Sequence, residues 1–167
     1  SRSCSGVRTG GCCDDLGRDV VITGIHHFAL TVHEMDRSIA FYRDLFGLEV
    51  LSDREVKRDY VERITAVEGA HLRIVHLVGY GKQVELLQYL HPRGATRSRD
   101  LPVVGSAHLC FVSDDLDADV ERLLAAEVTF RSMPVETTNG PNRGGRGIYV
   151  EDPDGNAVEV VQLAPRK

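Results

Sequence analysis

The sequence contains an internal repeat, and no other feature limits the possible folds as strongly. His27 and His108 each lie in a run of residues typical of a β-strand, and an amphipathic helical pattern follows each run. An offset of 81 residues aligns the two histidines and also the apolar stripes of the two helices: Met35, Ile39 and Tyr42 in the first, and Leu116, Val120 and Leu123 in the second. The repeat predicts two modules of one α+β topology, each with a strand, a helix and about three further strands.

The other elements are predicted from residue alternation, helix signals and turn residues. In the first half we expect a strand over 25–32, a helix from the N-cap Asp36 to Gly47, and strands at 50–54, within 60–78 and at 83–90. In the second half we expect a strand over 106–112, a helix, a strand over 128–137 and a Gly-rich loop over 138–147. A hairpin over 144–163 follows, with its turn at 151–156.

These elements predict four parts of the chain. Residues 1–19, rich in Gly, Ser, Arg and Cys, are expected to form a flexible N-terminal extension. Residues 20–90 form the first module, 91–103 a linker with two prolines, a glycine and three arginines, and 104–167 the second module. Three cysteines, Cys4, Cys12 and Cys13, fall in the extension and Cys110 in a strand, so neither a disulfide framework nor a paired-cysteine zinc motif is indicated.

Composition narrows the class of protein. Of the 167 residues 42% are hydrophobic, which is enough for a core, and no apolar run reaches the roughly 18 residues of a membrane span. The net charge is −5 and no basic stripe is present, which argues against nucleic acid as a partner. The first 24 residues hold no apolar stretch typical of a secretory signal, so we expect a cytoplasmic protein.

Strand alternation selects four chemically active side chains. Alternate residues of a strand share a face, so Glu159 lies with Ala157 and Val161, and Glu85 lies with Leu87. A carboxylate on an apolar face is costly unless it is paired or binds a metal. The alternative is an edge strand with a solvated glutamate. His27 and His108 lie among small or polar residues on their strands, opposite the large apolar side chains, so two curled modules would bring two histidines and two glutamates into one cup.

Four segments in order resemble the vicinal oxygen chelate superfamily, which includes glyoxalase I, methylmalonyl-CoA epimerase, extradiol dioxygenases and fosfomycin and bleomycin resistance proteins. They are IHHFALTVHEMDRSIAFYRDLFGLEV, QVELLQY, AHLCFV and GIYVEDPDGNAVEVVQL, within residues 24 to about 164. The resemblance implies two βαβββ modules with mixed sheets that curl around a metal site. It also implies that His27, Glu85, His108 and Glu159 are the metal ligands. These nitrogen and oxygen donors suit Ni, Co, Mn, Fe or Zn.

The polar residues outside the four proposed ligands are expected to have structural or solvent-exposed roles. His26 is expected to cap the core face, and His33, His71, His76 and His91 are expected to be exposed or satisfied locally. The arginines 93, 97 and 99 are expected to be solvated in the linker, with contact to an anionic substrate group as the alternative. Residues 139–145 are either a mobile lid or a plain hairpin loop.

The four-ligand set resembles that of glyoxalase I and methylmalonyl-CoA epimerase. The resemblance implies a metal-dependent lyase or isomerase that abstracts a proton next to a carbonyl, with Glu159 as the base and Glu85 as a second acid–base group. The alternatives are an Fe(II) ring-cleaving dioxygenase, which would use only His27, His108 and Glu159, and a non-catalytic small-molecule binding or resistance protein. The partners expected are a small-molecule substrate and a second copy of the chain in a homodimer. VGYG at 78–81 is similar to bacterial glyoxalase I, but 91–103 departs from that enzyme.

Overall fold

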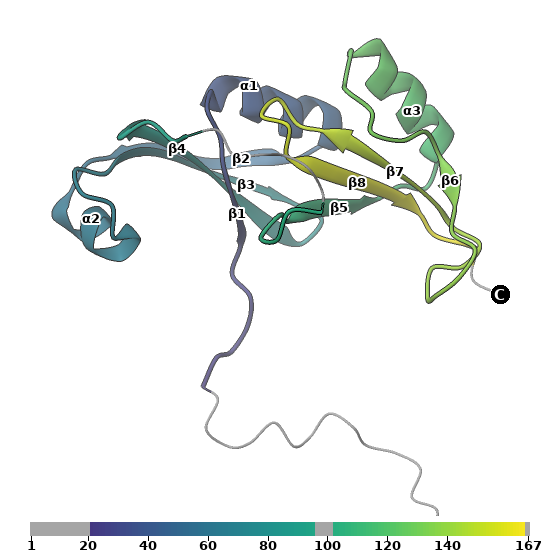
Figure 1. The fold of residues 1–167 in the computed structure, drawn as a ribbon, viewed down its shortest axis with the longest axis horizontal. Helices are drawn as coiled ribbons and strands as arrows, with labels where there is room; N and C mark the ends of the chain where they lie inside the picture. The colour runs from purple at the N-terminus through teal and green to yellow at the C-terminus, as the bar shows by residue number, and fades with distance from the viewer. Residues whose placement is uncertain (1–20, 96–101, 166–167) are drawn as a thin grey trace, which may run out of the picture.

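The computed structural model describes residues 21–95 and 102–165. Two four-stranded mixed sheets form the fold, and both have the same strand order (Figure 1). The first contains β1 (Phe28–Thr31), β4 (Lys82–His91), β3 (His71–Gly79) and β2 (Glu49–Val56), named in spatial order. The second contains β5 (His108–Val112), β8 (Ala157–Gln162), β7 (Arg146–Glu151) and β6 (Val135–Glu136).

The pairing pattern repeats in the two sheets. The first strand of each module lies parallel to the last, and the other pairs are antiparallel. Each first strand leads into a helix: α1 (Met35–Ala40), which continues as the π-helical turn η1 (Phe41–Leu45), and α3 (Leu116–Ala125). The predicted α+β fold of two βαβββ modules is therefore confirmed.

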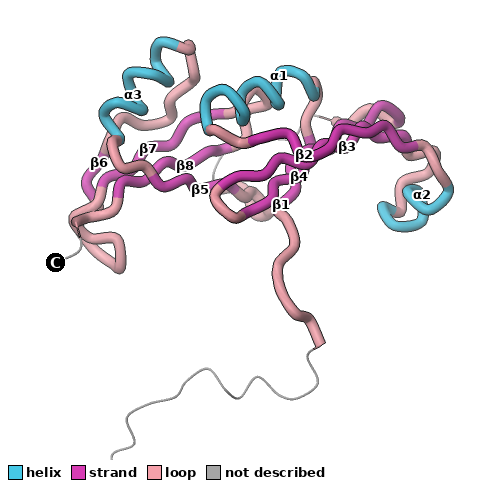
Figure 2. The backbone as a smooth tube through the Cα atoms, turned by 180° about the vertical axis from the view of Figure 1, so that it is seen from behind, coloured by secondary structure: helices cyan, strands magenta, loops and turns pink. Residues whose placement is uncertain are grey.

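One face of each sheet packs under the helices, and the other is open. In both views α1 and α3 lie on the same side of the sheets (Figures 1 and 2). Helix and sheet residues of both modules join in one buried cluster, which includes Met35, Tyr42, Leu86, Leu116, Leu123, Val150 and Val158. The apolar stripes predicted from the sequence thus face the core, and the faces that carry the histidines point away from it.

The two modules contact each other through this core. The Tyr42 hydroxyl donates a hydrogen bond to the Asp152 carboxylate over 3.0 Å, from η1 to the turn between β7 and β8. The rings of Phe46 and Phe111 lie 4.7 Å apart between centroids. The Arg122 guanidinium donates to the Leu45 carbonyl over 2.7 Å. These contacts set the relative position of the sheets within one chain.

A third helix was missed by the sequence analysis. Residues 60–78 are predicted as one strand region, but α2 (Asp59–Thr65) occupies its first part and only β3 follows. Tyr60, Val61 and Ile64 lie at helical spacing, but the helix has only seven residues and buries only Val61, so this short stretch does not stand out as a helix in the sequence. Val61 belongs to a small second cluster with Val56, Ala70 and Leu72 on the open side of the first sheet, where α2 also lies in Figures 1 and 2.

Two local predictions need correction. Glu34, not Asp36, is the N-cap of α1, and Asp36 lies in the first turn, where an acidic side chain favours the helix dipole. The predicted strand over 128–137 is reduced to β6 and an isolated bridge from Phe130, because Pro134 between them has no N–H to donate. The predicted helix end at Gly47 is correct, since that residue has a positive φ of 66°.

The predicted cup is not closed within one chain. β1 and β5 are both edge strands, and no strand pairing joins the two sheets among the described residues. None of the helices in the described ranges is long and apolar enough to cross a membrane.

Candidate active site

Glu85 lies at the centre of the first module's open face. Its strand β4 is flanked by β1 and β3, with Ala29 and His76 as its register partners. One carboxylate oxygen lies 3.4 Å from Nε2 of His27, and the other lies 2.8 Å from Nε2 of His76. Each oxygen of this largely buried carboxylate therefore lies beside an imidazole.

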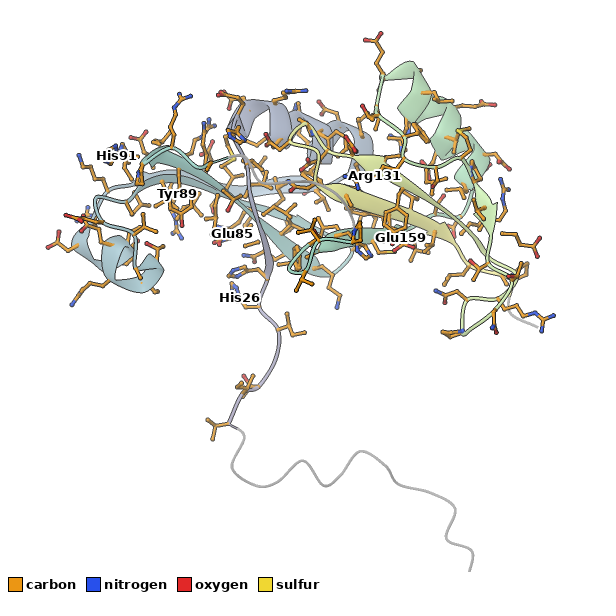
Figure 3. All side chains as sticks on the ribbon, in the orientation of Figure 1. His26, Glu85, Tyr89, His91, Arg131 and Glu159 are labelled. Carbon is orange, nitrogen blue, oxygen red and sulfur yellow. The ribbon has the colours of Figure 1, made fainter. Side chains whose placement is uncertain are left out.

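His27 is held from its other side as well. Its Nδ1 lies 2.8 Å from Nδ1 of His26, so one ring donates and the other accepts. His26 is exposed on the segment that leads into β1 (Figure 3), which corrects the prediction that it caps the core face. The arrangement leaves Nε2 of His27 facing the Glu85 carboxylate, as a metal ligand would require.

Glu159 occupies the equivalent place in the second module. β8 lies between β5 and β7, with Cys110 and Tyr149 opposite Glu159, so the alternative of a solvated glutamate on an edge strand is wrong. The Glu159 carboxylate lies 3.0 Å from Nε2 of His108, and the Tyr149 hydroxyl is 3.4 Å from the same nitrogen. Each module thus places one histidine and one glutamate together on its open face.

Two proton-bearing groups surround Glu159. Burial, together with the charge of Glu159, raises the pKa of the Cys110 thiol to about 11. The same two causes, in the same order, raise the pKa of Tyr149 to about 12. Both groups are therefore protonated at neutral pH and present O–H or S–H donors beside this carboxylate.

The two histidine–glutamate pairs do not meet within one chain. Figure 3 shows Glu85 and Glu159 on different sheets, and the described residues contain no group of three or more His, Cys, Asp or Glu that could hold a metal ion. The assignment of His27, Glu85, His108 and Glu159 to one site thus remains a prediction. It requires the two halves to come from different chains or the sheets to move together.

Sequence reasoning missed His76 and Tyr149 as parts of these clusters. Each lies on the strand before its glutamate, His76 nine residues before Glu85 (85 − 76) and Tyr149 ten before Glu159 (159 − 149). For Tyr149 the signal was present, because pairing the two strands of the predicted final hairpin about its turn sets it opposite Glu159. For His76 the missed α2 left the position of β3 undefined.

The other predicted polar residues lie outside these clusters. His33 pairs with Asp154 and His71 with Glu55, whereas His91 is exposed, so the prediction of exposed or locally satisfied histidines holds for them and also for His76. Arg93 lines a cavity of about 460 Å³ beside β1. Arg97, Arg99, Cys4, Cys12 and Cys13 lie outside the described residues.

Residues 24–160 match the family profile of the glyoxalase, bleomycin resistance protein and dioxygenase superfamily. The chain belongs to this superfamily. It is similar to a 2-epi-5-epi-valiolone epimerase of an Actinomyces species, with 31% identity over 83% of this chain and 79% of that protein. It is also similar to a probable lactoylglutathione lyase of Synechocystis, with 27% identity over 84% of this chain and 96% of that protein.

A solved structure supports the fold. A glyoxalase family protein from Bacillus cereus superposes with a TM-score of 0.79 over 89% of this chain and 99% of that one. Its sequence is 18% identical to this chain, so the likeness concerns the superfamily's architecture rather than its chemistry.

Proposed function

We propose that this superfamily member is a metal-dependent lyase or isomerase that abstracts a proton next to a carbonyl group of a small substrate. The observation that carries this proposal is the duplicated pair: each module presents one histidine and one glutamate, His27 with Glu85 and His108 with Glu159, on its open face. Relatives named an epimerase and a probable lactoylglutathione lyase are in keeping with isomerase or lyase chemistry.

The complete site is proposed to form between two copies of the chain. Within one chain the pairs lie on separate sheets whose open faces are not covered by α1 or α3. We call His27 with Glu85 the first half-site and His108 with Glu159 the second. A two-fold dimer brings the first half-site of each chain to the second half-site of its partner. Two complete sites then form, because such an interface is self-complementary. This proposal accounts for the exposure of His27 and His108, whose side chains remain 33% and 38% accessible.

The four side chains fit a divalent first-row metal ion. Two imidazole nitrogens and two carboxylates are borderline-to-hard donors, suited to Ni, Co, Mn, Fe or Zn. The two Nδ1 atoms of His26 and His27 are hydrogen-bonded to each other. A hydrogen bond of this kind, to the ring nitrogen that does not bind the metal, orients a ligating histidine. When bound, such an ion would polarise the carbonyl oxygen of a substrate and so acidify the neighbouring C–H bond.

Side chains of the protein would carry out the proton transfer and donate hydrogen bonds. Glu159 is the proposed base, because a carboxylate beside the substrate can accept the proton. Glu85 is the corresponding group on the opposite side, which an epimerase needs in order to return the proton to the other face. Tyr149 and Cys110 keep their protons at neutral pH and can donate hydrogen bonds to Glu159 or to a substrate oxygen.

The test uses protein purified without chelator. Its metal content is measured, and carbonyl substrates, among them hemithioacetals and thioesters, are incubated with it in heavy water while exchange at the α-carbon is followed by NMR. We expect about one metal ion per chain and enzyme-dependent exchange. Oxygen consumption with catechols, stoichiometric with product and without proton exchange, would instead identify a ring-cleaving dioxygenase.

A further inference from the structure

We infer that His76, supported by Ser52, is a positioning residue that fixes the Glu85 carboxylate as an anchored metal ligand and leaves Glu159 as the carboxylate that moves the proton. The inference rests on the proposed function and narrows it, because it gives Glu85 the role of a metal ligand and not that of a second acid–base group. It concerns a histidine that takes no part in the repeat detected in the sequence.

The first observation is a continuous chain of contacts across three strands. The Ser52 hydroxyl on β2 lies 2.9 Å from Nδ1 of His76 on β3, and Nε2 of His76 lies 2.8 Å from Glu85 on β4. One imidazole makes both contacts: Nδ1 is hydrogen-bonded to the serine hydroxyl, and Nε2 lies within ion-pair distance of the carboxylate.

The strands are shaped to allow the contact. The pairing of β2 with β3 shifts between Val50 and Ser52, and this irregularity brings Ser52 opposite His76. His76 in turn lies directly opposite Glu85. His76 is buried, with 9% of its surface accessible, so its ring has little freedom to turn away from the carboxylate.

The second module lacks this device. Tyr149 holds the position opposite Glu159 that His76 holds opposite Glu85. A tyrosine has one hydroxyl and cannot form a relay through two ring atoms as an imidazole does. The Tyr149 hydroxyl lies 3.4 Å from Nε2 of His108, and the serine near it, Ser132, accepts a hydrogen bond from the Tyr149 backbone N–H and not from its side chain. Glu85 therefore lies between two imidazoles, whereas Glu159 lies beside one imidazole, with Cys110 and Tyr149 opposite it on the neighbouring strands.

The inference predicts the effect of His76 substitutions on metal binding, with Co²⁺ as the probe in equilibrium dialysis and visible absorption. His76→Phe keeps a ring but removes the donor, and it should weaken Co²⁺ binding by about 10–100-fold and alter the absorption spectrum. His76→Gln can still donate to Glu85 and should stay within about threefold of the wild type. Rescue by glutamine separates positioning from mere packing.

His71→Phe is the matched control. His71 lies on the same strand and also pairs with a glutamate, Glu55, but neither belongs to a half-site. This variant should bind Co²⁺ like the wild type. If His76→Phe does not fold, Ser52→Ala and His76→Gln test the inference in its place. Ser52→Ala should weaken Co²⁺ binding by about 3–10-fold. Wild-type Co²⁺ affinity in the Ser52→Ala variant would overturn the role of the Ser52–His76 contact.

Equal Co²⁺ affinity and equal spectra in a folded His76→Phe variant and the wild type would overturn the inference while leaving the proposed function intact. A wild-type protein that binds no Co²⁺, Ni²⁺, Mn²⁺, Fe²⁺ or Zn²⁺ would overturn both. The two failures are therefore distinguishable from the wild-type binding curve alone.

Discussion

The two glutamates at the centres of the sheets differ in their neighbours more than in their positions. Glu85 contacts two histidines, and Glu159 contacts one histidine and lies opposite a tyrosine and a cysteine. A carboxylate with an imidazole beside each oxygen is suited to be a fixed ligand, and a carboxylate with fewer such neighbours is suited to proton transfer. This difference leads to a kinetic prediction.

Glu159→Gln removes the proposed base. We expect α-proton exchange to fall by about 10²–10⁴-fold even at saturating metal, because one acid–base group contributes that much. Glu85→Gln should mainly weaken metal binding, so raising the metal concentration should recover most of its exchange. NMR in heavy water as a function of metal concentration measures both. Equal recovery of the two variants by metal would contradict the assignment of Glu159 as the base.

Cys110 reports on the charge of Glu159. Its pKa is raised to about 11 by burial first and by Glu159 second, so at pH 8 the thiol is almost entirely protonated and alkylates slowly. Glu159→Gln removes the negative charge, lowers the thiol pKa, and should speed iodoacetamide modification of Cys110 at pH 8 in the presence of chelator. Mass spectrometry of the Cys110 peptide gives the rate. An unchanged or slower rate in the variant would show that Glu159 does not bear on this thiol.

At the scale of elements, Tyr42 on η1 and Asp152 in the turn between β7 and β8 tie the modules together. Burial raises the pKa of Asp152, and hydrogen bonds from Asn156, Tyr42 and the Asp154 backbone oppose that shift. Tyr42→Phe removes one of these donors from a buried carboxylate. We expect a loss of about 1.5–3 kcal/mol in the free energy of unfolding, measured by urea denaturation, with the half-exposed Tyr60→Phe as the control.

The pH dependence of this loss has a definite sign. A folded-state pKa above the unfolded value means that ionised Asp152 destabilises the fold at neutral pH and that protonation relieves this cost as the pH falls. The Tyr42 hydrogen bond matters most to the ionised form. The deficit of Tyr42→Phe should therefore shrink as the pH falls through the raised pKa, and a deficit that grows in acid would contradict this account of Asp152.

Strand and helix patterns predicted the fold where one face of an element was buried. Residue periodicity alone predicts the repeat and both core helices. It also predicts the open-face placement of four side chains: His27, Glu85, His108 and Glu159. Prediction failed where an element was short and buried few of its residues. α2 buries only Val61, and the segment around Pro134 forms little regular structure, so His76 could not be placed before β3 was known.

At the scale of the whole molecule, the chain has two half-sites on two open sheets. The sequence predicts both halves, but a single chain contains no information on the surface that it shares with a second copy. We propose that the two exposed pairs become one site only in the assembly. The proposed function therefore depends on a site that two chains share.

Complementation between two inactive chains tests this claim most directly. His27→Ala/Glu85→Gln destroys the first half-site, and His108→Ala/Glu159→Gln destroys the second, so neither variant alone should bind Co²⁺. In a mixed dimer, sites shared between chains leave one site with four intact ligands and one with none. We expect unfolded and co-refolded mixtures to regain about a quarter of the wild-type Co²⁺ stoichiometry, because about half of the dimers are mixed and each has one intact site. No recovery in mixtures shown by mass spectrometry to contain mixed dimers would contradict a site built from two chains.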